Sequence, residues 1–162
     1  GGVDNNNLTE KILESIDECT LLKNTKVVIV MGGTAPYLER VKNKVKLSTC
    51  QIELLIDVSD MAKIMAHSDI AIGAPGTTTW ERCCLGLPSL LIVQAENQKT
   101  IAKNLEENNL AVILNNVKNI CQTLYGFSAK SGEFDYVEMS KSSSKIIDGI
   151  GVDRVVGLLL ES

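Results

Sequence analysis

Two glycine-containing loops carry the residues best suited to hold an anion. Gly32-Gly33-Thr34 follows the apolar run 26–31, and Gly73-Ala74-Pro75-Gly76-Thr77-Thr78-Thr79 follows the apolar run 69–72. Glycine lets the backbone approach a phosphate closely, and a helix N-terminus presents unpaired N–H groups to it. The pair is typical of a diphosphate cradle, although each loop alone is equally expected as a tight turn after a strand. Neither loop matches the dinucleotide-binding or P-loop glycine patterns.

Glu81 has two interpretations that do not exclude each other. Thr78-x-x-Glu81 has the spacing of a capping box, in which Thr78 caps the helix and Glu81 reaches back to the cap N–H. A carboxylate in the first turn of a helix at a ligand-binding edge also accepts hydrogen bonds from sugar hydroxyls. The sequence therefore marks Glu81 both as a cap and as a candidate ligand-binding residue.

His67 is the only histidine, and it ends a predicted helix just before the run 69–72. The helix dipole favours histidine at that position. Without a second histidine a metal site is not expected, and no catalytic triad or acid/base pair is visible. The sequence shows a binding site without groups for chemistry, and we expect no metal and no cofactor.

Short apolar strands alternate with helices along the chain, which predicts an α/β fold with a doubly wound parallel sheet. The run 26–31 is rich in β-branched residues and predicts a strand buried on both faces. Thr9 is expected to cap the first helix and Ser59 a later one, with Met61, Ile64 and Met65 facing inward. Strands are expected at 26–31, 50–55, 69–72, 89–93 and 110–114. The first helix is expected to end at about residue 22, and further helices are expected at 36–45, after Ser59, around Trp80 to Cys84, at 97–108 and at 116–125. An irregular segment at 126–136 and two short helices, broken at Gly149 and Gly151, are expected to follow. Ligands of such sheets bind at the carboxyl edge of the strands, where both glycine loops fall.

The composition is that of one globular domain: 162 residues, 44% hydrophobic and 22% charged. A net charge of -4 without a Lys/Arg cluster argues against nucleic-acid binding, and no apolar run is long enough to span a membrane. Five cysteines without a CxxC pair favour reduced thiols in a cytoplasmic protein. Gly1-Gly2 without Met suggests a piece of a longer protein. We divide the chain into a loose segment and helix at 1–25 and an α/β domain at 26–162.

The stretch from Asp57 to Gln98 resembles a known family. It contains Ala-His-Ser-Asp-Ile-Ala-Ile-Gly, then Gly-Thr-Thr-Thr-Trp-Glu-Arg-Cys-Cys-Leu-Gly-Leu-Pro, then Glu-Asn-Gln. These motifs look like the C-terminal domain of the UDP-sugar hydrolases of pseudaminic acid biosynthesis. Those enzymes are in turn similar to the peptidoglycan N-acetylglucosaminyltransferase. The resemblance spans about residues 26–160, with Trp80-Glu81-Arg82-Cys83-Cys84 closer to the hydrolases.

The resemblance implies the Rossmann-like C-terminal half of a GT-B enzyme, with UDP-sugar as ligand and an N-terminal domain of the same polypeptide as partner. It implies that this half binds the nucleotide while the N-terminal domain carries the catalytic histidine. Glu81 would hold the ribose hydroxyls, and the backbone near Val58, with Met61, would meet the uracil. The diphosphate would be held by the glycine loops and the sugar by a later turn; the residues implied are Gly33, Thr34, Gly73, Gly76, Thr77, Thr78, Asn97 and Gln98.

Two positions depart from the family pattern, and three other functions stay open. Ala35 stands where an acidic residue is common, and Pro75 stands where glycine is common, which removes one N–H donor. The alternatives are the donor-binding half of a UDP-sugar glycosyltransferase, a non-enzymatic nucleotide-sugar-binding module, and a flavodoxin-like domain that binds flavin or phosphate.

Overall fold

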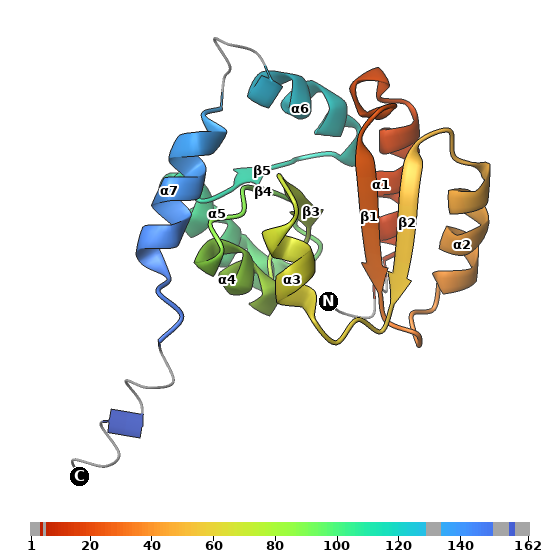
Figure 1. Cartoon of the computed structure of the whole chain (residues 1–162). Coiled ribbons are helices and arrows are strands. Elements are labelled where there is room, and N and C mark those ends of the chain that lie inside the picture. The colour runs from red at the N-terminus through yellow and green to blue at the C-terminus, as the bar shows by residue number, and fades with distance from the viewer. Residues whose placement is uncertain (1–3, 5, 129–133, 151–155, 158–162) are drawn as a thin grey trace.

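The computed structural model describes residues 4, 6–128, 134–150 and 156–157 (Figure 1). Helices and strands alternate through the chain, as the sequence predicts. The elements in order are α1 (Leu8–Asp17), η1 (Thr20–Leu22), β1 (Lys26–Met31), α2 (Leu38–Leu47), β2 (Gln51–Ile56), α3 (Met61–Ala66), β3 (Ala71–Gly73), α4 (Thr77–Cys84), β4 (Ser89–Leu91), η2 (Glu96–Gln98), α5 (Lys99–Glu107), β5 (Val112–Ile113), η3 (Val117–Asn119), α6 (Ile120–Ser128) and α7 (Tyr136–Ile146).

All strand pairs in the described residues are parallel, which confirms the predicted α/β class. The strands form two sheets rather than one continuous sheet: β1 pairs with β2, and β3, β4 and β5 pair in that order. The register aligns Met31 with Ile56 in the first sheet and Gly73 with Leu91 in the second. In Figure 1 the two sheets stand side by side, with α2 outside β2 and α7 on the opposite flank of the molecule.

The prediction that 26–31 is buried on both faces is wrong. Lys26 is exposed, the four middle residues are half-buried, and only Met31 is buried. The physical reason is that β1 pairs only with β2 in the part of the chain that the structure describes, so it is an edge strand whose side chains have neighbours on one side only. The β-branched composition correctly predicted a strand but overestimated its burial.

Three apolar clusters hold the elements together. The largest joins α1, the three-stranded sheet, α6 and α7 through residues that include Leu8, Leu90, Val112 and Leu124. A second lies between α5 and β4, and the third packs α2 against β1 and β2. Because Leu8 belongs to the largest cluster, α1 is packed into the fold, while the proposed division into 1–25 and 26–162 stays a prediction.

Two predicted helix caps are wrong. Thr9 lies inside α1; the carboxylate of Asp4 instead accepts from the N–H groups of Leu8 at 2.7 Å and Thr9 at 3.0 Å. Asp60, not Ser59, caps α3 by accepting from the N–H of Lys63 at 3.0 Å. In both helices a carboxylate provides the cap, which also suits the positive end of the helix dipole. The expected inward side of α3 is confirmed for Met65, which is buried.

Gly86 ends α4 and turns the chain into β4. Its φ is +62°, and its N–H donates to Cys83 O at 2.9 Å while Leu87 N–H donates to Arg82 O at 2.9 Å. This is the Schellman arrangement, which glycine adopts without steric cost. A Cβ at Gly86 would lie 3.0 Å from both Ser140 O and Ser140 Oγ. The turn therefore also sets how closely α7 packs on α4.

The prediction of five reduced cysteines is wrong. Cys19 and Cys121 form a disulfide that joins the end of α1 to α6 across 102 residues of sequence. Cys50, Cys83 and Cys84 are free. The sequence spacing gave no sign of this pair, because the two residues meet only when α6 packs beside α1.

Several sequence predictions concern the C-terminal part of the chain. The segment expected to be irregular at 126–136 is helical at both ends, since α6 reaches Ser128 and α7 begins at Tyr136. Residues 129–133, the break at Gly151 and most of the last expected helix lie outside the described residues. Among the helices that the structure describes, none is long and apolar enough to cross a membrane.

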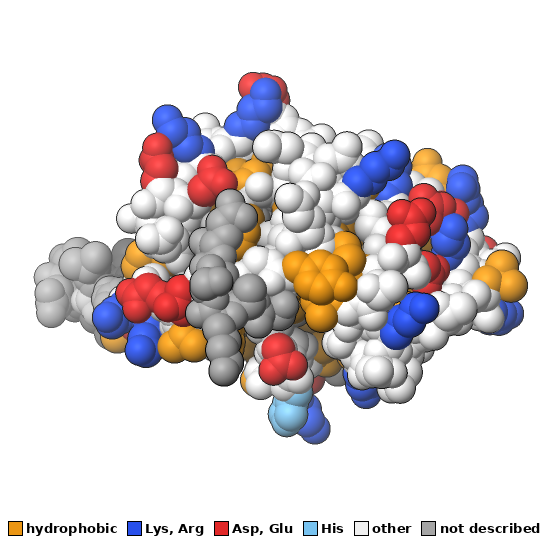
Figure 2. Space-filling view, turned by 90° about the horizontal axis from the view of Figure 1, so that it is seen from above, with side chains coloured by type: hydrophobic (Ala, Val, Ile, Leu, Met, Phe, Trp, Pro, Cys, Tyr) orange, Lys and Arg blue, Asp and Glu red, His pale blue; other side chains and the backbone are white. Residues whose placement is uncertain are grey.

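Charged side chains of both signs are mixed over the face shown in Figure 2, without a continuous basic stripe. Such a surface gives a polyanion no uniform field to follow.

Candidate functional site

The sequence-predicted ligand residues lie at the carboxyl ends of four strands. Gly33 and Thr34 follow β1, Val58 and Met61 follow β2, and Gly73 ends β3. The remaining residues lie at the start of α4 and in η2, which follow β3 and β4: Gly76, Thr77, Thr78, Glu81, Asn97 and Gln98. Parallel strands bring these loops to one edge of each sheet, where α/β proteins bind ligands.

The loop between β3 and α4 is closed by Thr79. Its hydroxyl Oγ1 accepts from the N–H of Gly76 at 3.0 Å, and its own N–H donates to Gly76 O at 2.9 Å. Thr79 is 1% exposed, so this reciprocal cap is buried beneath the loop. The predicted capping box of Thr78 and Glu81 is therefore wrong, because the helix begins two residues earlier, with Gly76 as its N-cap and Thr79 in the N3 position expected for Glu81.

The capping box of Gly76 and Thr79 leaves several polar groups at the start of α4 available. The N–H groups of Thr77 and Thr78 donate to no acceptor in the described part of the chain. Gly76 faces open space, since a Cβ there would meet no atom within 4 Å. Such N–H groups at a helix N-terminus, together with the dipole, favour a bound anion.

Glu81 lies in the second turn of α4 and is exposed. Its carboxylate forms no hydrogen bond or ion pair with any described residue, so it is free to accept hydrogen bonds from a ligand. The structure excludes the interpretation of Glu81 as a helix cap, and its role in ligand binding stays a prediction.

Arg82 was missed as a functional candidate. It is 4% exposed, and its guanidinium lies under the β3–α4 loop, donating to Ala74 O at 3.1 Å and to Thr79 Oγ1 at 3.0 Å. Burial lowers the pKa of Arg82 below its ordinary value. The signal that could have found it is its helical spacing: Arg82 follows Thr79 by three residues and precedes Cys83, on the inward side of α4.

The first glycine loop is chemically different from the second. The N–H of Gly33 donates to Asp57 Oδ1 at 2.7 Å, and a Cβ at Gly33 would lie 2.3 Å from Asp57 Oδ2. Asp57 itself has a φ of +52°, which turns the chain at the end of β2. A carboxylate thus already occupies the donor that a phosphate would need, which makes the loop before α4 the better anion site of the two.

The two departures from the family pattern have clear structural settings. Ala35 is buried in the cluster that packs α2 on β1 and β2, so its side chain does not face the carboxyl edge. Pro75 is fully buried inside the β3–α4 loop, where it contributes shape but no N–H.

The turn after β4 is partly closed upon itself. The amide oxygen Oε1 of Gln98 accepts from the N–H of Gln94 at 2.9 Å. The Nε2 group of Gln98 takes no part in this hydrogen bond. Asn97 is exposed at the same turn. Both side chains retain donors for a polar ligand.

His67 is the C-cap of α3, as its sequence position predicts. Its Nδ1 lies 2.7 Å from Lys63 O, one turn earlier in the same helix. The ring caps a helix end at the amino side of β3 and belongs to no cluster of His, Cys, Asp or Glu that could hold a metal among the described residues.

Comparison with known proteins decides the family. Residues 1–145 match the glycosyltransferase family 28 C-terminal domain. The chain belongs to this family. The parallel α/β architecture of this family 28 domain is that of the Rossmann-like C-terminal half of a GT-B enzyme.

Two proteins are similar in sequence to the family 28 domain. It is 28% identical over 162 residues to the spore coat polysaccharide biosynthesis protein SpsG of Bacillus subtilis, covering 98% of this chain and 48% of SpsG. It is 30% identical over 101 residues to the uncharacterized protein MJ1062 of Methanocaldococcus jannaschii, covering 61% of this chain and 20% of that protein. The family 28 domain thus spans about half of SpsG.

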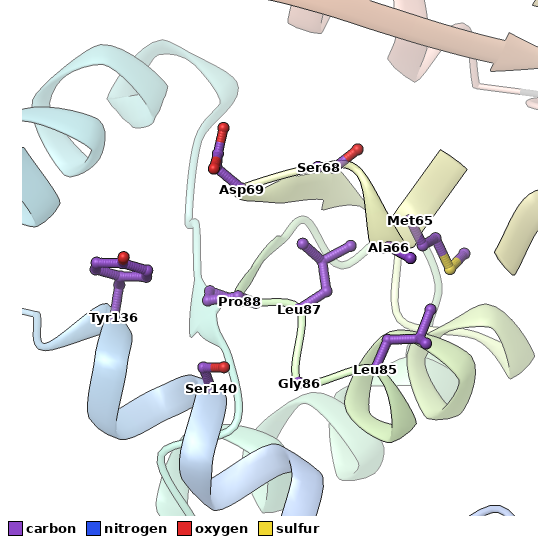
Figure 3. Close-up of a pocket in the computed structure, with 10 residues that line it drawn as sticks. All are labelled: Met65, Ala66, Ser68, Asp69, Leu85, Gly86, Leu87, Pro88, Tyr136 and Ser140. Carbon is purple, nitrogen blue, oxygen red and sulfur yellow. The ribbon is translucent and has the colours of Figure 1, made fainter. Parts of the chain in front are cut away.

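Two cavities of the family 28 domain lie away from the α4 N-terminus. One, of about 150 Å³, opens at the amino ends of β3 and β4, between the α4–β4 turn and α7 (Figure 3). Asp69, Tyr136 and Ser140 are among its lining residues, and the sequence-predicted ligand residues are not. The other, of about 360 Å³, lies beside α5 and is lined by Lys99, next to the η2 turn. Neither of these two cavities is lined by the residues predicted to bind the nucleotide.

Proposed function

We propose that this chain is the UDP-binding half of a two-domain enzyme that acts on a UDP-sugar, and specifically of a UDP-sugar hydrolase. The observation that carries the proposal is the β3–α4 loop. Gly76 faces open space, the N–H groups of Thr77 and Thr78 have no acceptor among the described residues, and a buried cap holds the loop in place. The match to the glycosyltransferase family 28 C-terminal domain supports a role in the chemistry of glycosyl groups.

The diphosphate is expected at the start of α4. The N–H groups of Thr77 and Thr78 point along the dipole of the helix and need no rearrangement to meet an anion. The first loop, with Gly33 and Thr34, faces the same edge but carries Asp57, so its contact with the diphosphate is the weaker part of the assignment.

The nucleoside is expected on the adjoining elements. Glu81 lies one helical turn beyond Thr77, where its free carboxylate accepts hydrogen bonds from the two ribose hydroxyls. The backbone at Val58 and the half-buried side chain of Met61 lie at the end of β2 and offer the uracil an apolar and hydrogen-bonding edge. Asn97 and Gln98 supply the polar contacts to the sugar.

The reaction would be completed by a second domain. In hydrolysis, water attacks the anomeric carbon, a base on the other domain takes the proton, and the bond from that carbon to the diphosphate oxygen breaks. UDP then leaves with its bonding electron pair, and the negative charge develops where the N–H groups of α4 are aimed. Within the described residues His67 is occupied as a helix cap, so we assign no base to this chain.

A glycosyltransferase half is the second candidate, because the matched family is named for glycosyl transfer and SpsG is named for polysaccharide biosynthesis. The donor site would be the same, and a sugar or lipid acceptor would replace water. The donor-binding chemistry of this chain does not distinguish the two reactions.

The first test is calorimetric titration of the chain with UDP, with CDP and inorganic phosphate as controls. We expect saturable binding of UDP that exceeds binding of both controls. Equal binding of CDP would remove base recognition from the site, and no binding of any of the three would contradict the proposal. Release of UDP from a UDP-sugar by the two-domain protein without an acceptor would then favour hydrolysis over transfer.

A further inference from the structure

Arg82 is a buried cation at the centre of the β3–α4 loop. Its guanidinium makes three hydrogen bonds, all to acceptors of this loop or of the first turn of α4. Nε donates to Thr78 O at 3.2 Å, and Nη2 donates to Ala74 O at 3.1 Å and to Thr79 Oγ1 at 3.0 Å. A single side chain thus fixes both the loop and the threonine that caps Gly76.

The positive charge of Arg82 has no carboxylate partner among the described residues. A buried charge is costly unless an opposite charge or a full set of hydrogen bonds compensates it. The third nitrogen, Nη1, donates to no described residue and lies under Gly73, where a Cβ would be 3.6 Å away. Nη1 is not among the buried polar atoms that lack a hydrogen bond, so it keeps a donor that reaches solvent, while the cation as a whole still has no opposite charge beside it among the described residues to provide compensation.

An anion at the N-terminus of α4 would supply that compensation. Such an anion would meet the N–H groups of Thr77 and Thr78 on the outer side of the loop, while Arg82 lies on its inner side. Because the guanidinium is held away from bulk water, its field at the loop is screened less than that of an exposed lysine. An arginine also stays charged at any physiological pH.

We infer that Arg82 is the positioning cation of the phosphate site: it shapes the Gly73–Thr79 loop from beneath and attracts the diphosphate of the nucleotide to it. The identification of the ligand as UDP rests on the proposed function. The inference that the loop binds a diphosphate group does not depend on it. A purely structural role would instead tie the loop together without any preference for anions.

The experiment compares Arg82→Gln, which removes the charge, and Arg82→Lys, which keeps it, using uridine, UDP and inorganic pyrophosphate as probes. We expect Arg82→Gln to weaken UDP and pyrophosphate about 10- to 100-fold while uridine binding changes about 2-fold or less. Arg82→Lys should recover part of the loss because it restores the charge without the planar fork. Equal weakening of uridine and UDP, or an unchanged affinity for pyrophosphate, would overturn the inference.

A measurement on the unmodified chain covers the case in which these variants do not fold. The ¹⁵N signals of the Arg82 guanidinium should shift on addition of pyrophosphate, while those of Arg40, which is exposed on α2, should not. Binding of pyrophosphate without a shift at Arg82 would contradict the inference. If pyrophosphate binds with this shift but UDP does not exceed CDP, the phosphate site stands and the proposed function fails; if neither anion binds, both fail.

Discussion

Individual side chains at the α4 N-terminus divide their tasks by burial. Thr79 and Arg82 are buried and hold the loop, while Thr77 and Glu81 are exposed and are left to meet a ligand. This division follows from the 3.6-residue period of the helix, which turns positions 79, 82 and 83 inward and positions 77, 80, 81 and 84 outward. Consecutive residues of one motif thus differ in burial, and we propose that the exposed ones bind the ligand while the buried ones stabilise the loop.

Glu81→Ala should weaken UDP binding by about 1–3 kcal/mol, because ribose hydroxyls would lose their acceptor. The unfolding free energy should change little, since the Glu81 carboxylate makes no hydrogen bond or ion pair within the described structure. Calorimetry with UDP and urea denaturation measure the two effects. Glu138→Ala, in the first turn of α7, is the matched control and should leave UDP affinity unchanged. Unchanged UDP affinity of Glu81→Ala would remove this residue from the site.

At the scale of elements, the β3–α4 junction is the part of the fold that we propose as the anion site. A three-residue parallel strand ends at Gly73, and the helix starts four residues later at Thr77. Pro75 and the Thr79 cap hold this short connection closed, and Arg82 fills the space beneath it. The β1–α2 junction has a similar glycine content, but Asp57 occupies its donor.

Thr79→Val should destabilise the protein by about 1 kcal/mol, the usual cost of losing a side-chain helix cap. It should also lower UDP affinity, because the Gly76 N–H would lose its acceptor and Arg82 Nη2 would lose one of its two acceptors. Thr79→Ser keeps the hydroxyl and should retain the UDP affinity of the unmodified chain. Thermal denaturation and UDP titration of the two variants check this; similar behaviour of valine and serine would show that the cap does not shape the site.

At the scale of the whole molecule, the disulfide and the largest apolar cluster join the N-terminal helix to the second half of the chain. Cys19 is 0% exposed at the end of α1, and its partner Cys121 lies in α6. Leu8 and Ile12 of α1 pack in the same cluster as Leu90 and Leu124. The covalent bond and the packing therefore act on the same pair of helices.

Breaking this disulfide should lower the unfolding free energy by about 2–5 kcal/mol, because a bond across a long loop restricts the unfolded chain. Urea denaturation with and without dithiothreitol measures the loss, and the difference should vanish in Cys121→Ser. Cys84→Ser, which removes an exposed free thiol, should leave the effect of dithiothreitol intact. Titration of the unfolded, unreduced protein should find three thiols, and a result of five would show that the bond does not form.

The local sequence pattern determined the order and type of the elements. The predicted strand at 26–31 coincides with β1, and the alternation of apolar runs with helical periods correctly gave parallel strands. The same pattern placed Gly76, Thr77 and Glu81 at a carboxyl edge, because the loop that follows a parallel strand begins at the carboxyl end of that strand. These properties depend on residues within a few positions of one another.

Tertiary packing alone decided which polar groups are free and which are occupied. Asp57 reaches Gly33 from another strand, and Cys19 meets Cys121 across most of the chain. Gly76 and Thr79 form the capping box in place of Thr78 and Glu81, and the buried Arg82 also binds the Thr79 hydroxyl. Sequence spacing describes neighbours along one element, whereas these contacts join elements or depend on what lies beneath a loop, so only the assembled fold determines them.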